Sequence, residues 1–292
     1  MAEFLAQYSI QRWMEMCPQG YLEDTVFGHE PEAHEPDTLL GDDDEREAAI
    51  RTTVGLVVGE RCALAASSGL INAAPDYPSK RFLATQTLDE ARHVEIFTQR
   101  LFDLGVKKDD LESTISRYAN PNLVKFAEVL LEKVDNGDFV AGVVGQNIVL
   151  EGMAFTVFEL LEAGNREFNP KFSQTLKGTI ADERRHVGFG ENRIGSLIQQ
   201  YPEKKPGIER MQQEMAYYML ATFNDSFSAA EPKSKPTAET PAAPADFHGT
   251  NLATATPEEM EAVLANTVIG EFKTRLARVG LEYQTPTVPV SA

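Results

Sequence analysis

Apolar residues recur at spacings of three and four along most of the chain, from about residue 43 to about residue 228. Ala, Leu, Glu and Arg dominate this stretch, so the pattern indicates amphipathic α-helices rather than strands. Segments rich in Pro, Gly and Asn, such as AAPDYPSK (73–80), interrupt the pattern. The predicted helices run from about 43 to 73, 80 to 104, 109 to 118, 121 to 134, 138 to 163, 171 to 200 and 206 to 227. We therefore expect an all-α fold.

The pattern divides the chain into four parts. Residues 1–42 read as an N-terminal arm with an acidic, Pro-containing loop, and 43–228 as the helical bundle. Residues 229–250 are rich in Pro and Ala and predict a flexible linker. In 251–292 we expect one amphipathic helix at about 257–279, with Thr256 as its N-cap. This helix cannot form a core alone, so it must dock on the bundle, on a second copy or on a partner.

Composition narrows the classes of partner and compartment. The 292 residues carry a formal charge of −18, which opposes binding to nucleic acid and to anionic lipid. No basic region followed by an apolar core opens the chain, and no uncharged apolar stretch reaches the length of a membrane span. Only two cysteines are present, Cys17 and Cys62. We therefore expect a cytoplasmic protein without a disulfide framework, a thiolate metal site or a membrane span.

A short motif occurs twice. LDEARHV (88–94) and ADERRHV (181–187) share the pattern Asp-Glu-x-Arg-His in a chain with only 5 histidines. Positions three apart lie on one face of a helix, so Glu90 projects with His93 and Glu183 projects with His186. One carboxylate and one imidazole make half of a metal site, and two such pairs facing each other predict two metal ions.

Two isolated carboxylates complete the predicted ligand set. Glu60 and Glu151 each lie in an apolar helix that precedes one copy of the motif. A lone carboxylate is costly to bury unless a cation or another partner compensates it. The order Glu60, Glu90-x-x-His93, Glu151, Glu183-x-x-His186 matches the ligand order of a ferritin-like four-helix bundle with a di-metal core and additional helices. Oxygen and imidazole ligands suit two iron ions, or manganese with iron.

Neighbouring residues have predicted supporting roles. A ligand imidazole usually donates its second N–H to a carboxylate. We expect Asp89 to orient His186 and Asp182 to orient His93 across the bundle, with Arg92 and Arg185 pairing with these aspartates. A single Glu-x-x-His on a helix is more often a solvated face, and an isolated Glu is more often satisfied by a hydrogen bond. Six candidates in the ligand order of a di-metal bundle outweigh those two alternatives. We expect the other histidines, His29, His34 and His248, to be exposed to solvent. We expect Cys62 to be a residue of the apolar core.

On these motifs the sequence resembles the ferritin-like di-iron carboxylate oxygenases and oxidases, over about residues 45–228. VGERCALAASSGL and the doubled motif are similar to hydroxylase α-subunits of bacterial multicomponent monooxygenases. NIVLEGMAF and ADERRHVGFG are similar to ligand-binding oxidases related to the ribonucleotide reductase small subunit. The resemblance implies O2 activation between two metals and oxidation of C–H, C=C or N–H bonds.

The chain also departs from these relatives. The position of the hydroxylases' pocket Thr is Phe155, with Thr156 beside it, and the position of the reductase radical Tyr is Phe97. The Tyr and Val that crosslink in the ligand-binding oxidases are replaced by Gln146 and Ala63. A tyrosyl-radical subunit and that crosslink are therefore not expected, and the relatives' substrates do not carry over.

Three functions follow as hypotheses. The first is an O2-activating di-iron oxygenase for a small organic substrate, in which Glu151 shifts to open a position for O2. The second is a di-metal ligand-binding oxidase, and the third a non-catalytic iron-binding or ferroxidase protein. An oxygenase needs an external electron donor, a ferredoxin or reductase, and we expect a homodimer by family analogy. The predicted pocket, which is mostly apolar, is lined by Ala63, Leu64, Ser67, Asn147, Ala154, Phe155 and Phe158.

Overall fold

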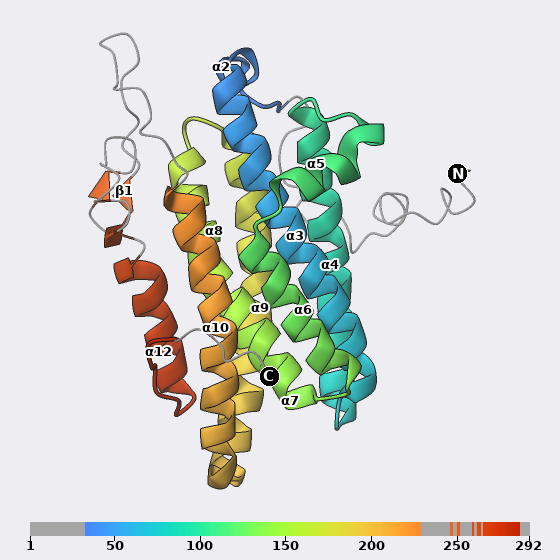
Figure 1. The fold of residues 1–292 in the computed structure, drawn as a ribbon, viewed down its shortest axis with the longest axis vertical. Coiled ribbons are helices and arrows are strands. Elements are labelled where there is room, and N and C mark those ends of the chain that lie inside the picture. Colours follow the sequence, from blue (N-terminus) through green and yellow to red (C-terminus); the bar gives the residue numbers. More distant parts are fainter. Residues whose placement is uncertain are drawn as a thin grey trace, which may run out of the picture.

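The computed structural model describes residues 33–228, 246–247, 250–251, 259, 262–263 and 265–286. Four long helices run alongside one another as a bundle (Figure 1): α3 (Asp43–Ala73), α4 (Tyr77–Asp103), α8 (Glu151–Asn165) and α9 (Pro170–Gln200). Helices α3 and α4 pack as one pair, α8 and α9 as the other, and α4 also contacts α9. The bundle is the all-α fold that the helical periodicity predicted.

Shorter elements surround the four helices. They are α2 (Asp37–Gly41), the 3₁₀ turns η3 (Lys108–Asp110) and η5 (Pro202–Lys204), α5 (Leu111–Tyr118), α6 (Pro121–Asp135), α7 (Phe139–Val143), the π-helices η4 (Val144–Leu150) and η6 (Ala265–Ile269), α10 (Lys205–Ser228) and α12 (Gly270–Arg278). Helices α6 and α10 pack together, and they cover α3 and η4 respectively. They bury the flank of the bundle formed by η4, which directly precedes Glu151 of α8.

The helices begin where the sequence supplies N-caps. Asp42 accepts hydrogen bonds from the backbone of Asp44 and Glu45 at the start of α3, and Asp76 accepts one from Ser79 at the start of α4. Asn120, Asp138 and Asn169 cap α6, α7 and α9 in the same way. Each such cap stabilises its helix by about 1 kcal/mol, which explains why the predicted breaks lie close to the observed ones.

The bundle interior contains two apolar clusters. One includes Val57, Phe97, Phe158 and Leu176, and the other includes Leu70. On α3, α4 and α9 the ligand candidates lie between residues of the first cluster and residues of the second. The polar centre is therefore enclosed at both ends by close-packed apolar side chains.

The C-terminal helix docks on the bundle itself. Phe272 and Leu276 of α12 are fully buried, and α12 contacts α8 and α9. This resolves the three docking alternatives in favour of the main body. The predicted helix of about 257–279 ends at Arg278 in the structure and includes the π-helical turns of η6.

Several local features differ from the sequence expectation. Helix α2 lies inside the predicted arm and loop, and a pair of two-residue strands, β1 (Asp246–Phe247) with β2 (Thr250–Asn251), lies at the end of the predicted linker. The continuous helix expected at about 138–163 contains the π-helix η4. His34 is exposed and its Nδ1 lies 2.8 Å from the carbonyl oxygen of Glu35. Cys17, His29, His248 and Thr256 lie outside the described residues.

Two stretches, Asp43–Ala73 and Phe139–Asn165, pass a length and hydropathy test for membrane spans. The apolar window of the second is 83% buried within the bundle. Core helices of water-soluble bundles pass the same test, so it is weak support for a membrane span.

Candidate metal centre

The six ligand candidates of the sequence analysis converge in the bundle interior. Glu60 comes from α3, Glu90 and His93 from α4, Glu151 from the first turn of α8, and Glu183 and His186 from α9. All six are buried, with exposures of 4% or less. Ionisable groups are seldom buried this completely unless they are paired or bind a metal, so the cluster is a site rather than surface decoration.

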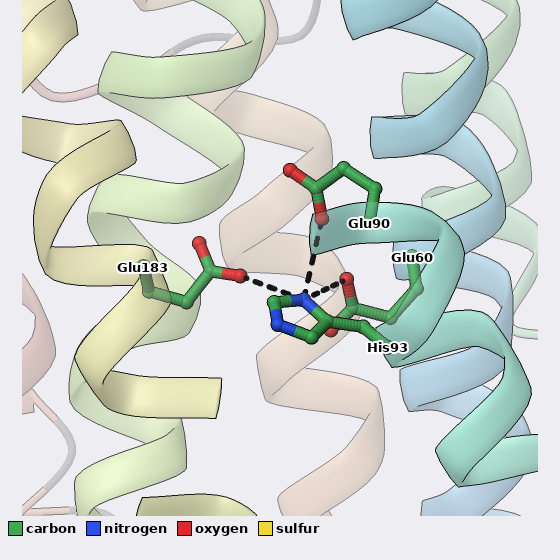
Figure 2. Close-up of side chains that lie close together, drawn as sticks. All are labelled: Glu60, Glu90, His93 and Glu183. Atoms are coloured by element: carbon green, nitrogen blue, oxygen red, sulfur yellow. Dashed lines mark ion pairs between the residues drawn. The ribbon is translucent and has the colours of Figure 1, made fainter. Parts of the chain in front are cut away.

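The first half of the site is centred on His93. Its Nδ1 lies 3.4 Å from Glu60 Oε2, 3.4 Å from Glu90 Oε2 and 3.4 Å from Glu183 Oε1 (Figure 2). In Figure 2 the three carboxylates point toward this nitrogen from three directions. One ligand atom from each of these four residues lies within 4.8 Å of the others, which leaves a position suited to one ion.

The second half is centred on His186. Its Nδ1 lies 3.3 Å from Glu90 Oε1, 3.5 Å from Glu183 Oε2 and 3.9 Å from Glu151 Oε1. Glu90 and Glu183 therefore turn one oxygen toward each histidine. Carboxylates placed in this way would each contribute to holding two ions.

Unsatisfied polar atoms test whether this set fits metal ions. The Nδ1 atoms of His93 and His186, together with Oε2 of Glu90 and of Glu183, are buried and have no hydrogen-bond partner. Buried polar atoms without a partner are rare and costly. These four atoms all face the positions between the ligand candidates, so the residues fit two cations, and the donor types suit iron and manganese.

The pKa values of the buried carboxyl groups also indicate a site for cations. Burial raises the pKa of Glu60 to about 8, despite the opposing effect of His93. Burial likewise raises the pKa of Glu151 well above its usual range, and Glu183 adds to the rise. Burial opposes ionisation of Glu183 too, but the adjacent His186 and His93 lower its pKa to about 2. The interior thus holds more carboxylate groups than its own cationic groups can neutralise. Two divalent cations would supply the missing positive charge.

The far nitrogens of both histidines contact aspartates across the bundle. His93 Nε2 lies 3.2 Å from Asp182 Oδ2, and His186 Nε2 lies 3.2 Å from Asp89 Oδ2. Arg92 donates to both aspartates, at 2.5 Å and 3.0 Å, and Arg185 does the same, at 3.0 Å and 2.5 Å. These are the contacts that the doubled motif predicted, and they present each Nδ1 to the centre; the roles of the four residues toward a metal stay predictions.

Sequence reasoning did not identify two glutamines. Gln86 and Gln146 are fully buried, and each donates to Glu151 Oε1, at 2.6 Å and 3.1 Å. Asn147, which we expect to be a polar group of the pocket, donates to Glu151 Oε2 at 3.0 Å. Uncharged polar residues within an apolar helical run were the available signal, and Gln86 lies one turn before Glu90.

The other pocket candidates lie around the same helices. Ala63, Ser67, Phe155 and Phe158 are buried, whereas Leu64 and Ala154 are half-buried. The Phe158 ring packs near the Phe97 ring, and Arg275 of α12 lies 4.8 Å from the centre of the Phe155 ring. The lining of a substrate pocket by these residues stays a prediction.

The arrangement matches solved structures, although no protein-family model and no curated protein matches the sequence. The fold is ferritin-like. An R2-like ligand-binding oxidase with an aerobically reconstituted Mn/Fe cofactor matches in two mutant forms. One has a TM-score of 0.67 at 15% identity, covering 95% of this chain and 93% of that one. The other has a TM-score of 0.63 at 17% identity, covering 81% of each.

A second ferritin-like neighbour has a different described chemistry. Protein 19 of Synechococcus, which has aldehyde deformylating oxidase activity, matches with a TM-score of 0.60 at 17% identity. The match covers 83% of this chain and 94% of that one. At these identities the likeness establishes the shared fold, and the chemistry must be argued from this chain's own residues.

Proposed function

We propose that this protein is a non-haem di-metal oxidoreductase that uses O2 to oxidise a small, largely apolar organic substrate. The observation that carries this proposal is the pair of buried three- and four-residue ligand clusters that share Glu90. Glu60 and His93 would hold one ion, Glu151 and His186 the other, and Glu90 and Glu183 would bridge them. Both R2-like neighbours are oxidases with an Mn/Fe cofactor, so either two irons or manganese with iron would suit the site.

When bound, the metal pair would supply the electrons that reduce O2 and the oxidising power that attacks the substrate. The chain's own contribution is to hold and shield the site. Asp182 and Asp89 fix the tautomers of His93 and His186, so that each Nδ1 is free to act as a ligand. The apolar clusters at both ends of the site exclude water. Insertion of one oxygen atom also consumes two electrons and two protons, so an external ferredoxin or reductase would be required.

The test combines metal content with reaction kinetics. The protein is loaded anaerobically with ferrous iron and mixed with O2 in a stopped-flow spectrometer. About two irons per chain and a transient visible absorbance are expected; His186→Ala should lower the iron content and abolish the transient. His34→Ala is the matched control, because His34 is exposed and lies outside the site. Metal-free protein, or iron without an O2-dependent transient, would overturn the proposal.

A substrate screen would then separate the enzyme from the ferroxidase alternative. With a chemical reductant present, an oxidase consumes O2 in many turnovers and yields an oxidised organic product. A ferroxidase yields no oxidised organic product, even while the reductant regenerates Fe²⁺ and O2 is consumed. Aliphatic aldehydes are a sensible first class, since the Synechococcus neighbour has aldehyde deformylating oxidase activity.

A further inference from the structure

Glu151 differs from the other carboxylates of the centre in its hydrogen bonds. Its Oε1 accepts from the side-chain amides of Gln86 and Gln146, at 2.6 Å and 3.1 Å, and its Oε2 accepts from Asn147 at 3.0 Å. Glu90 accepts a single amide hydrogen bond, from Gln86 at 3.2 Å, on Oε1, the oxygen that faces His186. Within the described part of the chain, no side-chain amide donates to Glu60 or Glu183. The amide donors are therefore concentrated on the half of the site that contains His186.

The orientation of these amides is fixed by further acceptors. Gln146 Nε2 also donates to the carbonyl oxygen of Ala63 at 3.1 Å. The two N–H groups of Asn147 are shared among Glu151 Oε2, Gln86 Oε1 at 3.1 Å and the carbonyl oxygen of His186 at 3.2 Å. A flipped amide would turn its oxygen against these oxygens. Each of the three side chains therefore presents N–H groups, not its carbonyl, to Glu151.

The π-helix η4 places two of the amides together. The backbone N–H of Glu151 bonds to the carbonyl of Gln146, five residues earlier, instead of four as in an α-helix. The wider turn brings Gln146, as well as Asn147, alongside the same carboxylate. A regular α-helix brings together positions three and four residues apart, not five, so this local irregularity adds Gln146 to the cluster.

Counting lone pairs shows what the amides do to Glu151 as a ligand. A carboxylate offers about four acceptor positions, and the amides take three of those on Glu151. The Glu151 oxygen that faces His186 Nδ1, at 3.9 Å, is Oε1, which already accepts two amide hydrogens. Glu60 Oε2, at 3.4 Å from His93 Nδ1, has no amide to displace. Metal ligation by Glu151 must therefore compete with hydrogen bonds, whereas ligation by Glu60 does not.

From this asymmetry we propose that Gln86, Gln146 and Asn147 are positioning residues that make the two metal sites unequal. The ion held by Glu60 and His93 binds first and tightly. The ion held by Glu151 and His186 binds second and more weakly, and that second position has the spare coordination capacity for an outside ligand. This inference rests on the di-metal centre of the proposed function, and it specifies which half of that centre is labile.

Stepwise metal binding tests the inequality of the two metal sites without measuring enzymatic activity. Metal-free protein is titrated with Mn²⁺ at pH 8, and free Mn²⁺ is followed by its EPR signal. Two ions should bind, the second roughly tenfold or more weakly than the first. Glu60→Ala should remove the tight step, and His186→Ala the weak one. The double variant Gln86→Met with Gln146→Met keeps side-chain volume but removes the N–H donors. In it, the affinity of the first Mn²⁺ should be unchanged, and the affinity of the second should rise to within about threefold of the first.

Matched variants keep the outcome interpretable. Gln212→Met replaces another buried glutamine, on α10, and should leave both steps unchanged. Gln86→Met alone should narrow the gap in part if the double variant fails to fold. Two equal affinities in the unaltered protein, or a double variant that shifts both steps or neither, would overturn the inference while leaving the di-metal centre intact. Protein that binds no Mn²⁺ would overturn both.

Discussion

The buried ion pair between Glu35 and Arg100 makes a quantitative prediction about stability. Arg100 donates to Glu35 at 2.9 Å and 3.3 Å and to Thr53 at 2.7 Å, and Asn169 donates to Glu35 at 2.6 Å. The arginine also stacks on the ring of Phe172, at 3.4 Å from its centre. The two charged residues are 2% and 7% exposed. The network ties the segment before α2 to α3, α4 and α9, and so fixes helices that carry five of the six ligand candidates.

Glu35→Gln removes the negative charge and leaves the guanidinium buried without compensation. Burial lowers the pKa of Arg100, and Glu35 is the main opposing influence. Breaking such a pair costs about 3–5 kcal/mol. For a domain of this size each kcal/mol shifts Tm by about 2–4 °C, so a fall of roughly 6–20 °C is expected.

Urea unfolding followed by far-UV circular dichroism measures the change in the free energy of unfolding. Glu112→Gln is the control, because Glu112 pairs with Arg61 on the surface with its side chain 72% exposed, and it should cost less than about 1 kcal/mol. The double variant Glu35→Leu with Arg100→Met should be less destabilised than Glu35→Gln. A loss below about 1 kcal/mol in Glu35→Gln would refute the reasoning.

Three further predictions concern the centre and the helices around it. Asp182→Asn should weaken Mn²⁺ binding about 10–100-fold in a chelator competition, whereas Asp225→Asn, on the surface, should not. Gly145→Ala should destabilise by about 1–3 kcal/mol in urea unfolding, because its Cβ would lie 2.5 Å from a methionine sulfur, whereas Gly59→Ala meets nothing within 4 Å and should be neutral or stabilising. The pKa of Glu60 rises on folding from 4.5 to about 8, so the folded, metal-free protein binds more protons and its stability should fall as pH rises from about 5 to 8; a flat profile by thermal melting would contradict this.

Much of the fold could be predicted from the sequence because its signals are local. Helical periodicity and cap residues such as Asp42, Asp76 and Asn169 act within a few residues of where they stand. The ligand set was readable for the same reason, since a spacing of three on a helix places Glu90 with His93 whatever surrounds them. The short helix α2 was missed, since its stability comes from distant contacts such as that of Glu35 with Arg100.

The sequence did not predict the difference between the two halves of the site, which comes from the amides that bond to Glu151. The doubled motif gives both halves the same ligand types, and nothing in it distinguishes His93 from His186. The difference arises from η4, where a π-helix replaces α-helical turns over only seven residues. Over so short a run the apolar pattern VGQNIVL fits either helix equally well, because every residue in it is buried. Packing from all sides removes the polar face that would reveal the period. The same enclosure leaves the amides of Gln146 and Asn147 no solvent to bond, so they bond to Glu151 instead. Dense packing therefore both hides the irregularity in the sequence and directs the amides onto one carboxylate of the centre.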